Sequence, residues 1–286
     1  MPMHPSPPED RDGLLDAFEQ NCQAIIDLGL SCRESDFDIQ TECPGWTVKD
    51  QIAHVVGAEK SFAGIPTPRV EVPAYPHIRS EFGRRIEHDV EARRGIPGKL
   101  VVHELADHLP IRMAALRAAA TPLDEVIGGF FGPETTFGTQ LRRRVLDTWV
   151  HEQDIRAALG RPGDLDSPGA AVFVEAIFQT LPRIIARDAR VPIGHAVVLD
   201  VTGPLIGREG ARVIEGEDGR PLGAPLFTGA EPTATDELPR ITGIKLTTEA
   251  LTRRAAGRRS TEEIRYTVHG DEEVARRVLD ALVITP

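Results

Sequence analysis

The feature that most constrains the fold is a linker at Arg161-Pro162-Gly163-Asp164, where the pattern of apolar residues changes. Adjacent proline and glycine end a helix and favour a turn. Before the linker, apolar residues recur at helical spacing, whereas after it helical stretches alternate with β-rich ones. The sequence therefore predicts two domains, a helical domain over residues 1–163 and an α+β domain over residues 164–286.

Four amphipathic helices are predicted in the first domain. They cover Asp10–Leu28, a stretch that begins at Thr47, Gly98–Ala120, and a stretch that ends at Leu159-Gly160. Thr47 and Asp50 form a capping box at the start of the second helix. A further helical segment, rich in arginine and glutamate, is expected over residues 78–94, and a loop rich in glycine over residues 121–137.

The second domain is predicted to mix helices with strands. Helices are expected over residues 170–186, 248–256 and 272–282, and strands over residues 195–203, 211–215, 241–247 and 264–268. Glycine and proline residues over 219–225 are expected to break that stretch into turns. This mixture is typical of an α+β fold.

Composition narrows the classes of function. Hydrophobic residues make up 41% of the 286 residues, and 44 acidic residues outnumber 33 basic ones, so the net charge is −11. This charge disfavours binding to nucleic acid or to an anionic membrane. Residues 1–12 lack the apolar core of a signal peptide and no long apolar run is present, so we expect a cytoplasmic protein.

Cysteine usage excludes two kinds of site. The chain has three cysteines, Cys22, Cys32 and Cys43, and no CxxC pair. An odd count without paired spacing predicts neither a disulfide framework nor a zinc site made of thiolates. Cys22 lies in the apolar stripe of the first helix and is expected in the core.

The last helix of the first domain carries a polar stripe that fits a binding site. Asp147, His151 and Asp154 are spaced i, i+4 and i+7, which places them on one face. A carboxylate and an imidazole one turn apart can hold one metal ion, as two histidines at the same spacing do. A third ligand must then come from elsewhere in the chain.

Simpler interpretations of these residues remain open. The two aspartates can instead pair with neighbouring arginines, namely Arg143, Arg144 and Arg156, on a solvated helix face. His54 lies beside the apolar stripe of the second helix, where a histidine is more often a hydrogen-bonded core residue than a ligand.

Several motifs resemble those of a known family. They are Pro44-Gly45-Trp46-Thr47-Val48, Ile52-Ala53-His54, and the run from Arg144 to Arg156. Together they resemble the metal-binding domain of the mycothiol-dependent maleylpyruvate isomerase family, a DinB-like four-helix bundle. The C-terminal part resembles the sterol-carrier-like α+β domain attached to that bundle, around residues 200–204, 247–259, 269–271 and 285–286.

The resemblance implies that His54, Asp147 and His151 bind one divalent metal, which is zinc in the isomerase. The isomerase has a glutamate where this chain has Asp147, whose reach is shorter by one methylene. The resemblance also implies mycothiol as the thiol cosubstrate. Asp154 is expected to support the ligands, by holding a neighbouring arginine or the ring N–H of a histidine.

A catalytic arginine is implied for the second domain. The isomerase family is thought to use one there, but Arg254, Arg258 and Arg259 all lie in the corresponding region and no single match is evident. Catalytic residues and residues that hold the cosubstrate therefore stay unassigned.

Two histidines and one carboxylate leave at least one coordination position open, as in catalytic zinc sites. Zinc stabilises thiolate, so we expect activation of mycothiol for S-transfer or for thiol-assisted isomerisation of a small electrophile. A metal-dependent hydrolase with Glu152 or Asp50 as general base is one alternative, and a non-catalytic small-molecule binding protein is another. We expect a monomer or a small homo-oligomer without nucleic-acid or membrane partners.

Overall fold

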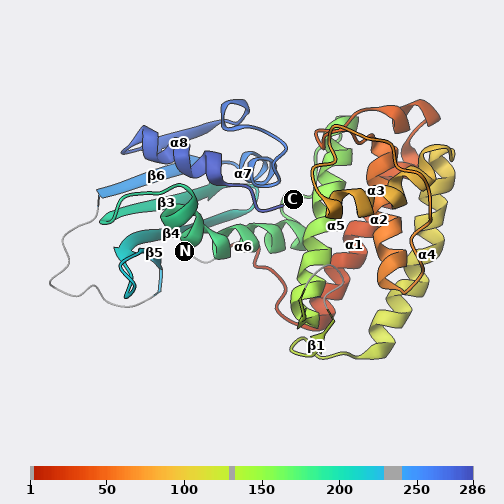
Figure 1. The fold of residues 1–286 in the computed structure, drawn as a ribbon, viewed down its shortest axis with the longest axis horizontal. Helices are drawn as coiled ribbons and strands as arrows, with labels where there is room; N and C mark the ends of the chain where they lie inside the picture. Colours follow the sequence, from red (N-terminus) through yellow and green to blue (C-terminus); the bar gives the residue numbers. More distant parts are fainter. Residues whose placement is uncertain (1–2, 129–132, 229–239, 286) are drawn as a thin grey trace. The chain divides into compact units, whose positions relative to one another are not determined.

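The computed structural model describes residues 3–128, 133–228 and 240–285 (Figure 1). The chain forms two compact units. One is Pro8–Gly163, and the other is Asp164–Pro286 together with Met1–Pro7. The first unit is helical and the second combines helices with a sheet, so the predicted fold classes, helical and then α+β, are confirmed.

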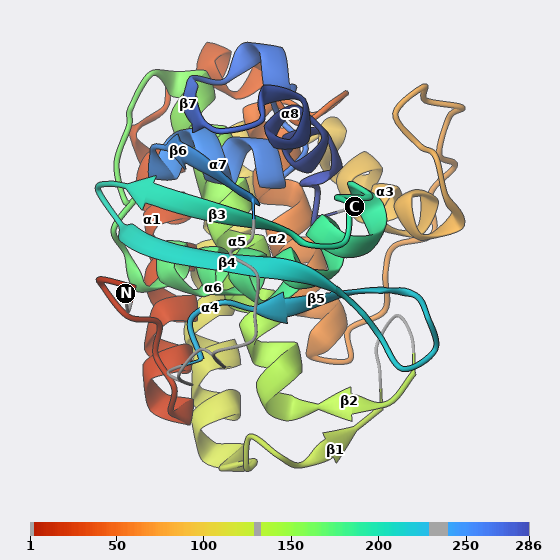
Figure 2. The same ribbon diagram turned by 90° about the vertical axis from the view of Figure 1, so that its left-hand side faces the viewer.

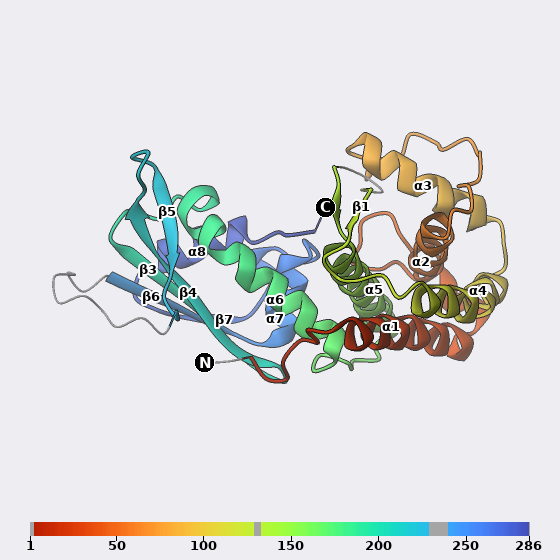
Figure 3. The same ribbon diagram turned by 90° about the horizontal axis from the view of Figure 1, so that it is seen from below.

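The helical unit is built from long helices that pack against one another. Its helices are α1 (Arg11–Ser31), α2 (Val48–Phe62), α3 (Glu81–Arg94), α4 (Gly98–Ala119) and α5 (Phe137–Leu159), with a 3-10 turn at Glu34–Asp38 and two short strands, β1 (Val126–Ile127) and β2 (Thr135–Thr136). Helix α1 packs on α4 and α5, and α2 packs on α3, α4 and α5 (Figure 3). The contact between α2 and α5 is the one that brings the predicted site residues together.

Local sequence sets the ends of these two helices. The Thr47 side chain accepts from the Asp50 backbone N–H, and the Asp50 carboxylate accepts from the Thr47 backbone N–H, which is the predicted capping box. Thr136 caps the start of α5, and Gly160 ends it in the left-handed conformation, at φ 62°. Ile52 on α2 and Trp149 on α5 are fully buried and anchor the helices in the core.

The second unit contains a five-stranded sheet in the order β5-β4-β3-β6-β7 (Figure 2). Its strands are β3 (His195–Thr202), β4 (Ile206–Glu215), β5 (Pro221–Pro225), β6 (Arg240–Leu246) and β7 (Tyr266–His269). Strands β3 and β6 are parallel, and the other neighbouring pairs are antiparallel. The helices α6 (Pro168–Arg183), α7 (Thr248–Ala255) and α8 (Glu272–Ala281) pack against this sheet.

Two strand predictions in this unit are wrong. Residues 221–225 form the edge strand β5 rather than turns, because an edge strand tolerates prolines whose missing N–H is not needed for pairing. Strand β4 begins at Ile206 instead of Ala211, since its pairing with β3 overrides the low strand propensity of Gly207 and Gly210. At its start, Ile206 exchanges backbone hydrogen bonds of 2.8 and 2.9 Å with His4.

Among the residues that the structure describes, one helical segment is long and apolar enough to cross a membrane. It is Pro168–Asp188, which comprises α6 and the short π-helix after it, and 61% of its most apolar 18-residue stretch is buried inside the protein. Such burial is what a core helix shows, and α6 packs on β4 and β5.

Candidate metal centre

The structure brings together the three residues implied as metal ligands. His54 comes from α2, while Asp147 and His151 lie one turn apart on α5. One ligand atom from each residue can be chosen so that all three lie within 4.8 Å of one another. His54 Nε2 is 3.4 Å from Asp147 Oδ2, and His151 Nε2 is 3.5 Å from Asp147 Oδ1.

These distances fit a tetrahedral zinc site. Zinc–nitrogen and zinc–oxygen bonds of about 2.0–2.2 Å at tetrahedral angles separate neighbouring ligand atoms by about 3.3–3.5 Å. Each imidazole nitrogen is at that spacing from one oxygen of the Asp147 carboxylate, His54 from Oδ2 and His151 from Oδ1. Because one ligand atom from each residue lies within 4.8 Å of the others, the three side chains can converge on one ion. A donor set of two imidazoles and one carboxylate occurs in catalytic zinc sites.

The electrostatics of His54 and Asp147 also suit metal binding. Burial, and secondarily the neighbouring His151, lowers the pKa of His54 below its usual value, so this imidazole is neutral near pH 7. Burial alone would raise the pKa of Asp147, but the Arg144 guanidinium and the two histidines hold it well below its ordinary range. His54 and Asp147 are therefore in the protonation states that metal ligands need.

Gln51 orients one of the two imidazoles, and the sequence analysis missed it. Its Oε1 atom lies 2.6 Å from His151 Nδ1 and accepts a hydrogen bond from that ring nitrogen. The Gln51 amide nitrogen donates to Thr41 Oγ1 over 2.7 Å, which fixes the amide orientation. A proton held on Nδ1 leaves the Nε2 lone pair free for a metal.

Trp46 covers one side of the imidazoles. Its ring centroid lies 5.1 Å from that of His54 and 5.8 Å from that of His151. The indole N–H donates to Glu87 Oε2 over 3.0 Å, and Glu87 is buried. The His77 ring nitrogen Nε2 lies 3.0 Å from the same oxygen. This packing keeps water away from that side of the candidate centre and restrains both rings.

Arg144 holds the third ligand residue. Its Nη1 donates to Asp147 Oδ2 over 2.8 Å, and its Nε donates to Glu59 Oε1 over 2.7 Å. Asp147 thus makes the pairing with Arg144 that the sequence offered as the simpler interpretation, while also facing the two histidines.

The comparisons with known proteins now decide the family. The family model described as mycothiol maleylpyruvate isomerase N-terminal domain matches residues 18–156. Residues 18–156 form a domain of the mycothiol-dependent maleylpyruvate isomerase family. The expected family is thereby confirmed, and its matched domain covers His54, Asp147 and His151.

Solved structures of the isomerase share the fold. A crystal structure of mycothiol-dependent maleylpyruvate isomerase and one of its histidine-to-alanine mutant are each 14% identical to this chain. Each match covers 90% of this chain and 92% of the other, with TM-scores of 0.50 and 0.52 respectively. At this identity the likeness shows the fold alone. No curated protein sequence matches the chain.

The histidine ring N–H that Asp154 was one candidate to hold is held by another residue. Asp154 Oδ2 lies 3.8 Å from His151 Nδ1, beyond hydrogen-bond distance, whereas Gln51 Oε1 lies at 2.6 Å. Asp154 is nevertheless fully buried in the helical unit. Asp154 lies on the same face of α5 as His151, as predicted, but Gln51 on α2 is the residue that accepts the hydrogen bond from His151 Nδ1.

The two residues considered as general bases for a hydrolase are engaged elsewhere. Glu152 accepts a hydrogen bond of 2.6 Å from Arg156, one turn along α5. Asp50 caps α2 by accepting from the Thr47 backbone N–H over 2.9 Å, and it also pairs with Arg94. Carboxylates committed to a cap and to ion pairs are poorly placed to take a proton from water.

Of the C-terminal arginines, Arg254 has a structural role. Its guanidinium donates to three backbone carbonyls, those of Leu279, Arg259 and Asp280. Arg258 donates to the Ala256 carbonyl. Arg259 donates to Glu249 over 3.1 Å on the surface of the same unit. Arg254, on α7, therefore binds the C-terminal end of α8.

Proposed function

We propose that this protein is a metal-dependent enzyme that activates mycothiol for S-transfer to a small electrophile or for its thiol-assisted isomerisation. The observation that carries the proposal is the spacing of 3.4 and 3.5 Å from the two imidazole Nε2 atoms to the Asp147 oxygens. A tetrahedral metal held by these three side chains would have a fourth position for an exogenous ligand.

The family match supports mycothiol as the thiol cosubstrate, and the set of donor atoms supports a bound metal. A bound divalent cation lowers the pKa of a coordinating thiol, so that the thiol is deprotonated and nucleophilic near neutral pH. The matched family is named for its mycothiol-dependent isomerase, and the two solved structures bear that enzyme's name. We therefore assign the thiol to the fourth position.

The side chains of the protein prepare the centre. His54, Asp147 and His151 would hold the metal, and Gln51 keeps the proton of His151 on Nδ1. Trp46 excludes water on one side of the imidazoles. These restraints reduce the reorganisation needed when the metal and the thiol bind.

Zinc is the metal that we propose. Two imidazoles and a carboxylate suit it, and the shorter reach of Asp147 is compatible with the measured spacings. The chain has three free cysteines and the proposed chemistry needs a reduced thiol, so we also propose a reducing, cytoplasmic location.

The architecture supports finer assignments of the two units. Helices α1, α2, α4 and α5 pack together in a way that fits a DinB-like four-helix bundle. The mixed sheet with α6, α7 and α8 fits a sterol-carrier-like domain. Both assignments are part of the proposal.

The test combines metal analysis with a cobalt spectrum. We expect the purified protein to retain one zinc per chain, and the cobalt-substituted form to gain a sulfur-to-cobalt charge-transfer band when a thiol is added. The His54→Ala variant should lose both properties. The control is His108→Ala, because His108 on α4 is as buried as His54 but lies outside the triad.

Two results would refute the proposal. One is a wild-type protein that binds no zinc under conditions in which it is folded. The other is a His54→Ala variant that holds zinc and shows the charge-transfer band as the His108→Ala control does.

A further inference from the structure

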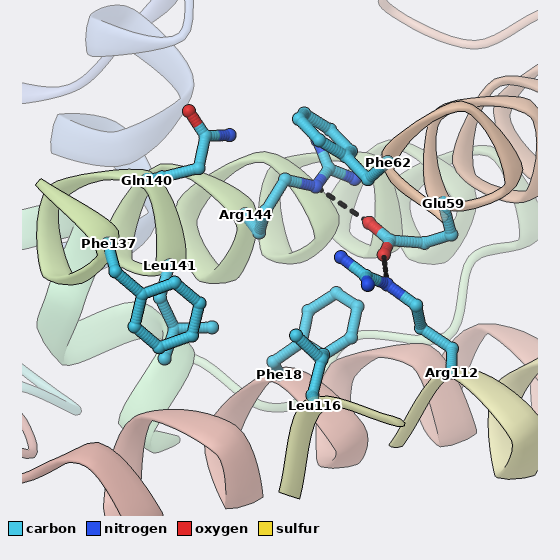
Figure 4. Close-up of a pocket in the computed structure, with 9 residues that line it drawn as sticks. All are labelled: Phe18, Glu59, Phe62, Arg112, Leu116, Phe137, Gln140, Leu141 and Arg144. Carbon is cyan, nitrogen blue, oxygen red and sulfur yellow. Dashed lines mark hydrogen bonds and ion pairs between the residues drawn. The ribbon is translucent and has the colours of Figure 1, made fainter. Parts of the chain in front are cut away.

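A chain of buried charges leads away from the candidate metal centre to a pocket of the helical unit. Glu59 lies on α2, five residues after His54, and is almost fully buried. Its Oε1 accepts from Arg144 over 2.7 Å, and its Oε2 accepts from Arg112 over 3.1 Å. Figure 4 shows one carboxylate oxygen of Glu59 turned to each arginine.

The pocket beside this pair is small and lined largely by apolar groups. It encloses about 280 Å³, including the part that is open to solvent. Its lining residues are Phe18, Glu59, Phe62, Arg112, Leu116, Phe137, Gln140, Leu141 and Arg144. An ion pair against apolar walls is screened less than one on the surface, so Glu59 and Arg144 interact strongly.

The bonding of Arg144 shows which contacts determine its position. Nε donates to Glu59 and Nη1 to Asp147, and the guanidinium carbon lies 4.9 Å from the centre of the Phe62 ring. The remaining nitrogen, Nη2, is buried and has no hydrogen-bond partner within the described residues. A buried donor without a partner costs about 1–3 kcal/mol. The two carboxylates therefore hold Arg144 in place despite that loss.

Asp147 needs this restraint more than the histidines do. Its side chain is 33% exposed, whereas the side chains of His54 and His151 are each 8% exposed. A short carboxylate at the edge of a site can turn toward solvent, and turning it back for a metal has an entropic cost. The bond from Arg144 Nη1 to Oδ2 holds the carboxylate between the two imidazoles.

We propose that Glu59 and Arg144 are positioning residues that set the metal affinity of the centre by holding Asp147 toward the histidines. This inference rests on the proposed function, since it requires the triad to bind a metal. Glu59 acts two contacts away from the metal: it fixes Arg144, and Arg144 fixes Asp147. Removing such outer contacts typically weakens metal affinity by about 10- to 100-fold.

Two substitutions interrupt this chain of contacts. In Glu59→Gln the negative charge is lost, and the new amide nitrogen must face one of two guanidinium groups. Arg144→Lys keeps the charge, but an ammonium lacks the planar fork that spans Glu59 and Asp147. We expect both variants to bind zinc about 10- to 100-fold more weakly than the wild type, with the lysine variant less affected.

The matched control is Glu104→Gln. Glu104 on α4 also holds two cations within the helical unit, Arg93 over 2.7 and 2.8 Å and Lys60 by a short ion pair. It has no contact with Arg144 or Asp147 among its hydrogen bonds and ion pairs in the described residues. It should lose stability as Glu59→Gln does, but keep zinc affinity to within about threefold of the wild type, as expected of an independent site.

Zinc affinity is measured by competition with a chromophoric chelator, and thermal unfolding of the same metal-free samples reports stability. Weaker zinc binding by Glu59→Gln than by Glu104→Gln, at similar loss of stability, supports the inference. Equal zinc affinities in these two variants overturn it while the proposed function stands. A wild type that binds no zinc overturns both.

Arg112→Gln keeps the test decisive if Glu59→Gln does not fold. Arg112 lies at the end of the chain of contacts opposite to Asp147, and its loss frees Glu59 Oε2 to attract Arg144. Arg144 would then be drawn away from Asp147, and zinc binding should weaken roughly threefold or more. Unchanged zinc affinity in a folded Arg112→Gln protein would also overturn the inference.

Discussion

Replacing Gln51 by leucine should weaken metal binding without touching a ligand. Gln51 is fully buried, and its Oε1 is 2.6 Å from His151 Nδ1. Leucine has a similar size but no acceptor, so the proton on Nδ1 loses its partner. The tautomer with the proton on Nε2 then becomes more favourable, because Asp147 Oδ1 lies 3.5 Å from that nitrogen. A metal would have to reverse that change before it could bind.

The size of the effect follows from the lost hydrogen bond. A buried donor left without an acceptor costs about 1–3 kcal/mol, and a tenfold change in affinity corresponds to about 1.4 kcal/mol. The zinc affinity of Gln51→Leu should therefore fall by roughly 5- to 150-fold. This range agrees with the loss of about 10- to 100-fold that is typical when the partner of a ligating histidine is removed.

The assay is zinc competition with a chelator, together with nitrogen chemical shifts of the histidine rings in the metal-free protein. Gln51→Glu keeps an acceptor for Nδ1 and should bind zinc at least as tightly as the wild type. Gln153→Leu is the control, because Gln153 is a buried glutamine on α5 that donates to the Gly163 carbonyl over 3.2 Å. Equal zinc affinities for Gln51→Leu and Gln153→Leu would refute the reasoning.

Two further predictions concern stability. Burial opposes ionisation of Glu104, but its bonds to Arg93 and Lys60 lower its pKa from 4.5 to about 2. This carboxylate stabilises the folded state above pH 4.5, and its contribution of about 3 kcal/mol is lost as the pH falls toward 2. In denaturant titrations, the deficit of Glu104→Gln should shrink over that range, and a constant deficit would contradict this. Arg254→Met should lower the unfolding temperature by removing three bonds to backbone carbonyls, yet leave zinc affinity unchanged; reduced affinity would contradict a purely structural role.

The main part of the candidate centre was predictable because it is local in sequence. The i, i+4 spacing of Asp147 and His151 holds in any helix, and the structure has α5 over both residues. The apolar stripe of the first helix likewise placed Cys22 in the core, and Cys22 is fully buried, so that burial raises the pKa of its thiol. Motif resemblance, confirmed by the family match, added His54.

Gln51 and Glu59 could not be found in this way. Both are polar residues on α2, and periodicity places polar helix residues toward solvent by default. Each is buried only because a partner from another helix meets it, His151 for Gln51 and the two arginines for Glu59. Such pairings depend on how helices pack, which single-helix patterns do not encode. The edge strand β5 was missed for the same reason, since its pairing with β4 is a tertiary contact.

The Arg144–Asp147 contact unites two interpretations that the sequence left as alternatives. An exposed arginine–aspartate pair at i, i+3 contributes about 0–1 kcal/mol and requires no site. Arg144, however, is buried and bonded to Glu59, so its side chain cannot move toward solvent together with that of Asp147. The pair therefore restrains the carboxylate instead of neutralising it on the surface. A carboxylate oxygen has two lone pairs, so Oδ2 can accept from Arg144 and still offer an electron pair to a metal held between Asp147 and the imidazoles. The ion pair thus keeps Asp147 ionised and oriented as a metal ligand must be.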